Sequence, residues 1–180
     1  MVSHKARPRF GKATPVHVTM RMKQGVWNLR SRRCFGLLRT CLVKARERFG
    51  MRLIEFSVLG NHLHLIVEPD SHESLSRGMQ GLSVRVAKAL NRLMQREGSV
   101  LADHYHSRLL ETPTELVNAI AYVLGNSAHH YGGDASSDPF SSANCARGVL
   151  LVTPVGWLLR VGWRRAKRRL PDWMMNSLRG

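Results

Sequence analysis

The sequence has 180 residues, and 28 Lys and Arg against 12 Asp and Glu give it a formal net charge of +16. This length predicts one compact domain of about 100–150 residues plus an extension, and a hydrophobic content of 43% excludes wholesale disorder. Three cysteines without a Cys-x-x-Cys pair argue against a disulfide framework or a zinc cluster, and Cys34 and Cys41 are expected to pack as small apolar residues.

The charge predicts an acidic partner, because a strongly positive field attracts phosphate groups or anionic lipid. The alternative is that the surplus Lys and Arg only keep the protein soluble. Residues 1–14 contain five basic side chains, counting His4, and no acid, and they predict a solvated arm without the apolar core of a signal peptide. The most apolar stretch, 149–159, is interrupted by Pro154 and Gly156 and is too short to cross a bilayer. We therefore expect a cytoplasmic, nucleoid-associated protein with no membrane segment.

The periodicity of apolar residues predicts the elements in chain order. Alternation over 15–22 predicts a half-buried strand, and a stripe at helical spacing predicts a helix over 32–49. Two strand-like runs at 52–59 and 62–68, joined at Gly60-Asn61, predict a hairpin. In its first strand we expect Ile54, Phe56 and Val58 to share one face and Glu55 and Ser57 the other.

A second helix is predicted over 72–96, followed by an irregular strand within 100–111. Thr112, Pro113 and Glu115 then form a capping box with Pro at the first helical position, which predicts a helix from Pro113 to about His130. The order is β-α-β-β-α-β, followed by a helix and a basic tail. This order predicts an α+β, ferredoxin-like fold with an antiparallel sheet, whose helices cover one face and leave the other open.

Two histidines provide a candidate metal site. His62 and His64 are two positions apart on a predicted strand, so both imidazoles lie on one face and can share a divalent ion. The pattern is short, and a second His-x-His occurs at His104 and His106. The alternatives are two surface histidines, or a zinc site that adds His106. The open face, which also carries His17, Thr19, Glu55 and Ser57, has no aromatic residue, and this disfavours an RNA-binding module.

The last predicted helix carries a candidate nucleophile. Asn118, Tyr122 and Asn126 recur every four residues, opposite the apolar stripe. A phenol in this position can act as a covalent nucleophile, and Asn126 presents an amide oxygen one turn away. The alternative is an ordinary amphipathic tyrosine between helix and sheet. Tyr105 and Tyr131 are competitors, but Tyr131 is expected to face away from Tyr122 at the end of the helix.

Three segments together resemble a known family. GNHLHLIVEPD resembles the histidine–hydrophobe–histidine motif of the HUH endonuclease superfamily. PVHVTMRM and YHSRLLETPTELVNAIAYVLGN resemble the first strand and the tyrosine helix of the single-tyrosine transposases of small insertion sequences, in particular the REP-associated tyrosine transposase-like branch. The resemblance covers about residues 12–131. In this sequence Leu59-Gly60 stands where the motif usually has Met-Pro, and Asn126 where relatives often have Gln.

The resemblance implies a metal-dependent endonuclease that nicks and rejoins single-stranded or hairpin DNA through a 5′-phosphotyrosine. It implies that His62, His64 and Asn126 bind Mg²⁺ or Mn²⁺ and that Tyr122 is the nucleophile. The domains expected are a basic arm (1–14), a catalytic domain (15–131), and a linker with a basic extension (132–180). A homodimer is compatible with the sequence. The alternative is a catalytically inactive DNA- or RNA-binding protein of the same fold.

Aromatic residues outside the motifs have two interpretations. Trp27, Trp157 and Trp163 are candidates for stacking on unpaired bases, and each is equally compatible with a place in the core.

Overall fold

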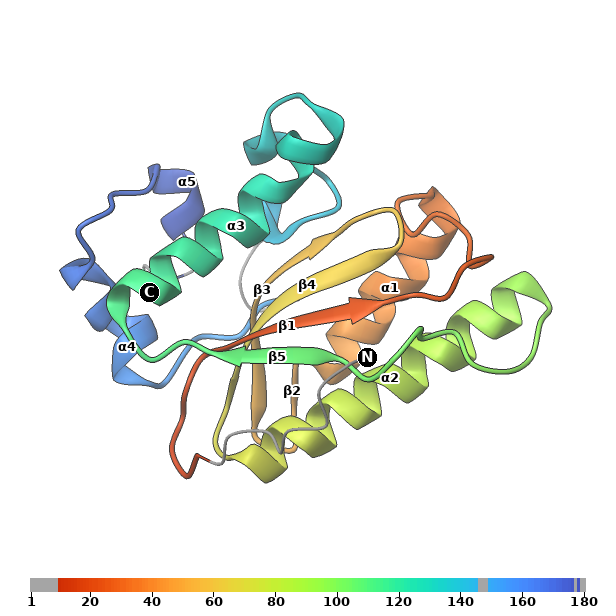
Figure 1. Cartoon of the computed structure of the whole chain (residues 1–180), viewed down its shortest axis with the longest axis horizontal. Helices are drawn as coiled ribbons and strands as arrows, with labels where there is room; N and C mark the ends of the chain where they lie inside the picture. Colours follow the sequence, from red (N-terminus) through yellow and green to blue (C-terminus); the bar gives the residue numbers. More distant parts are fainter. Residues whose placement is uncertain (1–9, 146–148, 177, 179–180) are drawn as a thin grey trace.

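The structure is a computed structural model that describes residues 10–145, 149–176 and 178. It has the predicted β-α-β-β-α-β order, with one additional two-residue strand, β2 (Figure 1). The elements up to the end of the third long helix are β1 (Val16–Arg21), α1 (Arg32–Ala45), β2 (Glu47–Arg48), β3 (Met51–Val58), β4 (His62–Pro69), α2 (His72–Met94), β5 (His106–Leu109) and α3 (Pro113–Tyr131). Most of the predicted arm lies outside the described residues.

The strands form one antiparallel sheet in the order β2-β3-β4-β1-β5. Without the short β2, this is the ferredoxin-like arrangement, so the predicted α+β fold is confirmed. The β1–β4 pairing places Thr19 opposite His64 and Arg21 opposite His62. This register brings polar residues of β1 beside the two histidines.

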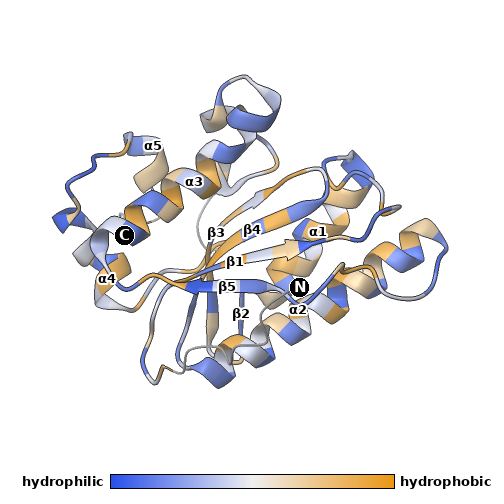
Figure 2. Ribbon diagram, in the orientation of Figure 1, coloured by the Kyte–Doolittle hydropathy of each residue, from blue (hydrophilic) through white to orange (hydrophobic). Residues whose placement is uncertain are grey.

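Helices α1 and α2 cover one face of the sheet and enclose the main core (Figures 1 and 2). The alternating apolar residues of β1 and β4 point into it, among them Val18, Leu63 and Leu65. Cys34 and Cys41 of α1 are buried in the same core, as their helical spacing predicts.

Several boundaries differ from those expected. The first helix ends at Ala45 because the chain turns into β2 and then passes through Phe49 and Gly50, both with positive φ (57° and 72°). The second helix ends at Met94 instead of residue 96, and the strand expected within 100–111 is shorter, since β5 covers His106–Leu109. Such differences of a few residues reflect turn geometry that apolar periodicity does not report.

The expectation of an open second sheet face is wrong for β3 and part of β4. Helix α3 packs across this face, and its apolar stripe encloses a second core with Ile54 and Ile66. Ile54 packs in this second core, whereas Phe56 packs in the main core, because a register shift between Leu53 and Glu55 interrupts the alternation. Glu55 and Ser57, expected on an open face, are therefore buried.

The chain after Tyr131 also packs against the sheet. Its short helices are η1 (Ala135–Ser137), η2 (Ser142–Asn144), α4 (Trp157–Arg160), η3 (Gly162–Arg165) and α5 (Asp172–Met175). Ser141 forms a bridge with Ser57, and the buried carboxylate of Glu68 accepts hydrogen bonds from the amides of Val155 and Gly156. Helices α4 and α5 then lie against α3. Among the described residues, no helix is both long and apolar enough to cross a membrane.

Candidate metal and tyrosine site

Strand β4 presents His62 and His64 on the sheet face that looks toward α3. Their ring centroids are 4.8 Å apart, as the two-residue period of a strand requires. His64 is 4% exposed, whereas His62, at the beginning of the strand, is half-buried. The pair therefore has one buried and one accessible imidazole.

In both rings Nδ1 is engaged with a neighbouring group. The Nδ1 of His64 lies 3.1 Å from the hydroxyl of Thr19 and 3.2 Å from Nε2 of His17. The Nδ1 of His62 lies 2.8 Å from the amide oxygen of Asn61. The Nε2 of His64 is buried and has no hydrogen-bond partner. Contacts of this kind orient an imidazole so that its other nitrogen can bind a metal ion.

The surroundings keep these histidines neutral. Burial, reinforced by the nearby His17, His62 and Arg21, lowers the pKa of His64 to about 3. Burial also lowers the pKa of His62, with a smaller effect of Arg21, and the pKa of His17, with a smaller effect of Arg108. A neutral imidazole has a free lone pair, which is the form that binds a metal ion.

Helix α3 brings Tyr122 to the histidines. The capping box expected at Thr112 and Glu115 is present and begins the helix shortly after strand β5 ends. Further along the helix, the ring of Tyr122 lies 5.1 Å from that of His64 and 5.8 Å from that of His17. Half of the Tyr122 side chain is exposed (51%), so a substrate can reach it from solvent.

Asn126 lies one turn after Tyr122 and is 4% exposed. Its amide nitrogen is buried without a hydrogen-bond partner. Rotation of the amide by 180° exchanges this nitrogen with the oxygen, so the same position can present a metal ligand. Two imidazole nitrogens and an amide oxygen suit a divalent cation that accepts nitrogen and oxygen ligands.

The zinc alternative has no support in the described part of the chain. There, no three His, Cys, Asp or Glu side chains converge on one point. His106 is exposed on β5 and lies opposite Thr19, so that strand β1 separates it from His64 on β4. Asn126, on the helix that carries Tyr122, offers an oxygen ligand of another type.

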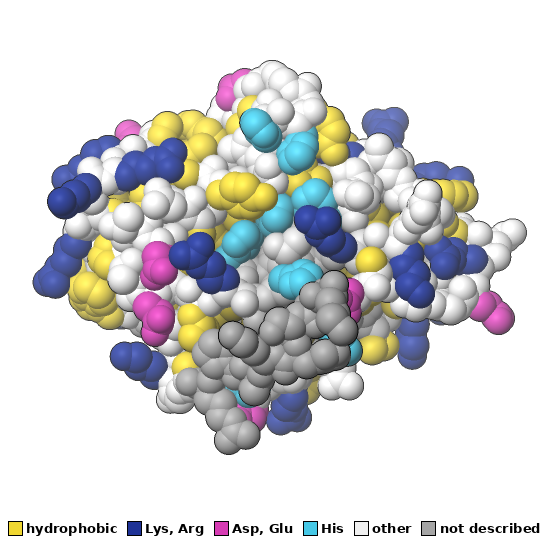
Figure 3. Space-filling view, viewed as in Figure 1, with side chains coloured by type: hydrophobic (Ala, Val, Ile, Leu, Met, Phe, Trp, Pro, Cys, Tyr) yellow, Lys and Arg dark blue, Asp and Glu magenta, His cyan; other side chains and the backbone are white. Residues whose placement is uncertain are grey.

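Sequence reasoning gave no site role to His17 and Thr19, although both contact His64. The alternation of β1 predicts the sheet face on which they lie, but their contact with His64 depends on the pairing of β1 with β4. Figure 3 shows histidine side chains gathered in one band across this side of the molecule, with Lys and Arg around it. A pocket beside Tyr122 is lined by His17, Arg108 and Asn118.

The remaining aromatic candidates contact other parts of the molecule. Tyr131 ends α3, and its hydroxyl accepts a hydrogen bond from the amide of Gly60. Tyr105 packs against the main core. Trp27 and Trp157 are about half exposed, whereas Trp163 packs against the second core.

Comparison with known proteins identifies the family. The family model described as "Transposase IS200 like" matches residues 13–123. The chain belongs to this family of transposases. Its fold is similar to that of a REP-associated tyrosine transposase solved in complex with a REP hairpin, with a TM-score of 0.65 and 16% identity over 94% of this chain and 100% of that chain.

A second solved structure, a Deinococcus radiodurans R1 protein described as a transposase, is similar with a TM-score of 0.46 and 12% identity, over 66% of this chain and 92% of that one. No curated protein matches the sequence significantly. Membership of the IS200-like transposase family assigns this chain a transposase-type function in DNA processing.

Proposed function

We propose that this transposase nicks and rejoins single-stranded DNA at hairpin-containing sites, with Tyr122 as the nucleophile and a Mg²⁺ or Mn²⁺ ion as cofactor. The observation that carries the proposal is the position of Tyr122. Its half-exposed ring packs 5.1 Å from the ring of His64, whose buried Nε2 has no partner. A solvent-accessible phenol thus lies beside an imidazole whose second nitrogen has no partner, and this supports the proposal.

The metal ion would be held by His62, His64 and Asn126. Burial keeps His64 neutral, and its Nδ1 contacts with Thr19 and His17 leave Nε2 for the ion. A bound divalent cation polarises a phosphate oxygen and neutralises charge that develops during displacement at phosphorus. The chain's own contribution is to orient the ligands and to place Tyr122 next to them.

The covalent step exchanges one phosphate ester for another. The Tyr122 oxygen forms a bond to phosphorus and loses its proton to solvent, while the bond from phosphorus to the 3′ oxygen breaks and that oxygen takes up a proton. The products are a 5′-phosphotyrosine and a free 3′-hydroxyl. Attack by a 3′-hydroxyl on the phosphotyrosine reverses the step, so rejoining needs no ATP.

Charge supports nucleic acid as the partner. The net charge of +16 provides many cations that can displace counterions from a phosphate backbone. Lys and Arg side chains surround the histidine band on the face that carries Tyr122 (Figure 3). The REP-associated relative of similar fold was solved with a hairpin, and a hairpin with a single-stranded flank is therefore the first substrate to test.

The proposal is tested with a 3′-labelled single-stranded oligonucleotide that contains a hairpin, incubated with Mn²⁺ and analysed on a denaturing gel. Wild type should give a band shifted by covalent attachment to protein, and Tyr122→Phe should give none while it binds the hairpin as wild type does. Tyr105→Phe is the matched control and should form the adduct. If Tyr105→Phe loses the adduct and Tyr122→Phe retains it, the nucleophile is wrongly assigned. If wild type forms no adduct with either metal, the inactive DNA-binding alternative is favoured.

A further inference from the structure

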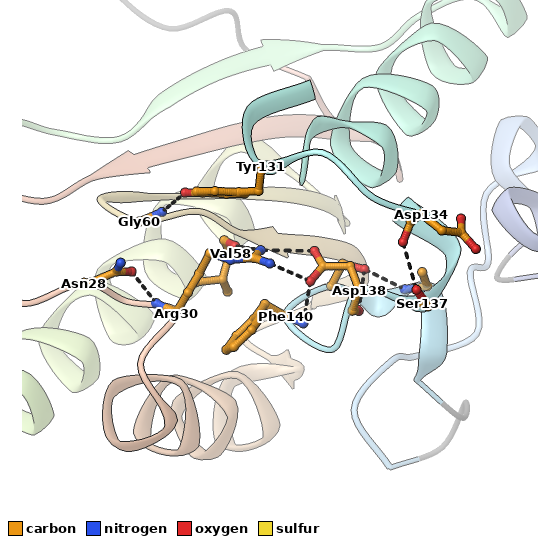
Figure 4. Close-up of polar contacts among 11 residues, drawn as sticks. Asn28, Arg30, Val58, Gly60, Tyr131, Asp134, Ser137, Asp138 and Phe140 are labelled. Atoms are coloured by element: carbon orange, nitrogen blue, oxygen red, sulfur yellow. Dashed lines mark hydrogen bonds and ion pairs between the residues drawn. The ribbon is translucent and has the colours of Figure 1, made fainter. Parts of the chain in front are cut away.

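A cluster of side chains joins the end of α3 to the turn that precedes His62 (Figure 4). We call it the Arg30 clamp, and it consists of Arg30, Gly60, Tyr131, Asp138 and Phe140. These residues come from the loop before α1, the β3–β4 turn, the end of α3, and the segment after η1. By sequence, Tyr131 is a candidate only as a competing nucleophile, and the other four have no site role.

Arg30 is the centre of the clamp. Its guanidinium donates to the carbonyl of Val58 (2.9 Å) and forms a bidentate ion pair with Asp138 (2.8 and 3.1 Å). The same group lies over the rings of Tyr131 and Phe140, 4.5 and 4.3 Å from their centroids. Because the Asp138 side chain is only 4% exposed, the pair is largely shielded from water. Arg30 therefore holds Tyr131 in one orientation at the end of β3.

The hydroxyl of Tyr131 reaches the turn itself. It accepts a hydrogen bond of 2.8 Å from the amide of Gly60. A Cβ at position 60 would lie 3.2 Å from this hydroxyl, so glycine allows the close approach. On the other side the carbonyl of Gly60 accepts from the amide of Leu29 (2.9 Å). The turn is thus held between α3 and the loop before α1.

The positions along the chain connect this clamp to the proposed metal centre. Asn126 is five residues before Tyr131, a rise of about 7.5 Å along the helix. His62 is two residues after Gly60, about 6.6 Å along an extended strand. The hydrogen bond from Gly60 to Tyr131 therefore links helix α3, which carries Asn126, to the turn that leads into His62. Short segments of chain separate this bond from both residues.

We infer that Tyr131, oriented by Arg30, is a positioning residue that sets the separation of Asn126 from His62 and His64 and so the affinity of the site for its divalent cation. The inference rests on the proposed function, because it assumes a metal ion at these three residues. Tyr131 touches neither metal nor DNA in this role. It acts through the Gly60 turn on one side and through its own helix on the other.

Removing the hydroxyl alone isolates this role. Tyr131→Phe keeps the ring against Arg30 and removes the bond to Gly60. A neutral hydrogen bond of this kind contributes about 0.5–1.5 kcal/mol. Because the bond also forms without metal, only part of this free energy can act on the site, so Mn²⁺ should bind more weakly by at most about 10-fold. The Tyr131 side chain is 53% exposed, and loss of the bond should lower the melting temperature by no more than about 1–6 °C. Tyr131→Ala also removes the stack on Arg30 and should weaken Mn²⁺ binding further.

The test measures Mn²⁺ binding to the full chain without DNA, by calorimetry or by the electron paramagnetic resonance of free Mn²⁺. Tyr105→Phe is the matched control, because it removes a tyrosine hydroxyl beside the main core, and it should bind Mn²⁺ as wild type does. The rate of adduct formation by Tyr131→Phe should return to the wild-type value at saturating Mn²⁺.

Three results would overturn the inference. Equal Mn²⁺ affinities of wild type and Tyr131→Phe would show that the bond between Tyr131 and Gly60 does not affect the affinity of the site for Mn²⁺. Loss of the adduct in Tyr131→Phe at saturating Mn²⁺ would give Tyr131 a role in the reaction itself. Absence of Mn²⁺ binding by wild type would refute the proposed metal centre, and with it any positioning of its ligands.

Discussion

Replacing His64 with Ala should abolish the effect of Mn²⁺ on thermal stability. His64 is the more buried of the two histidines of the proposed centre, and its buried Nε2 has no hydrogen-bond partner. Without it, two ligands remain, His62 on a partly exposed strand end and Asn126 on α3. We expect this pair to bind Mn²⁺ too weakly to stabilise the fold.

The size of the effect follows from ligand linkage. A ligand at 100 times its Kd stabilises the native state by about 2.7 kcal/mol. For a chain of this length, each kcal/mol raises the melting temperature by about 2–4 °C. Wild type should therefore melt about 5–11 °C higher in saturating Mn²⁺ than in a chelator. His64→Ala removes a buried ring but also a buried nitrogen without a partner, and these effects oppose each other. The comparison therefore concerns the Mn²⁺-induced shift, not the melting temperature without metal.

Differential scanning fluorimetry with a Mn²⁺ titration measures the shift directly. His104→Ala is the matched control, because His104 is exposed and belongs to the second His-x-His pattern; it should keep the full shift. Adduct formation in the same samples should disappear in His64→Ala and persist in His104→Ala. A full Mn²⁺ shift in His64→Ala would refute the assignment of this residue as a ligand, and retained cleavage would remove it from the mechanism.

Three further outcomes are expected. Neutralising the five cations of residues 164–169 should reduce the slope of log K against log salt concentration for binding to single-stranded DNA. The reduction should be at most about 3.5, because each phosphate that a side chain neutralises contributes about 0.7 to the slope. An unchanged slope in a binding titration would show that other cations contact the DNA. Asp138→Asn leaves the partly buried Arg30 without its ion pair and should lower the free energy of unfolding by about 2–3 kcal/mol in urea, and an effect below about half a kcal/mol would contradict this. Because burial lowers the pKa of His64 from 6.5 to about 3, the unfolded chain binds the additional proton between these values. The free energy of unfolding should therefore fall as the pH is lowered through that window, and less steeply in His64→Ala; an identical pH profile for the two proteins would contradict the low pKa.

Local patterns in the sequence predict most of the fold and half of the candidate site. The two-residue period of β4 places His62 and His64 on one face, and the capping box at Thr112 and Glu115 begins α3 where expected. These predictions hold because side-chain direction along a strand and helix initiation depend on neighbours a few residues apart. The spacing of Tyr122 and Asn126 likewise places both on related faces of α3, but it does not say what that face meets.

Contacts between distant segments are not predicted by the sequence pattern and are seen only in the tertiary structure. The register shift at Leu53 and Glu55 turns Ile54 into the second core, and α3 and the C-terminal segment cover a face that periodicity leaves open.

Some contacts depend on which segments the folded chain brings together. Examples are the contacts of His64 with residues of β1 and the ion pair of Arg30 with Asp138, 108 residues later. The same is true of the pKa of His64, since burial is its main cause. The sequence by itself determined which residues could do chemistry and which face of each element would carry them. Only the packing of α3 on the sheet decided that Tyr122 meets the histidines, because apolar periodicity records that a face is buried but not the surface that buries it.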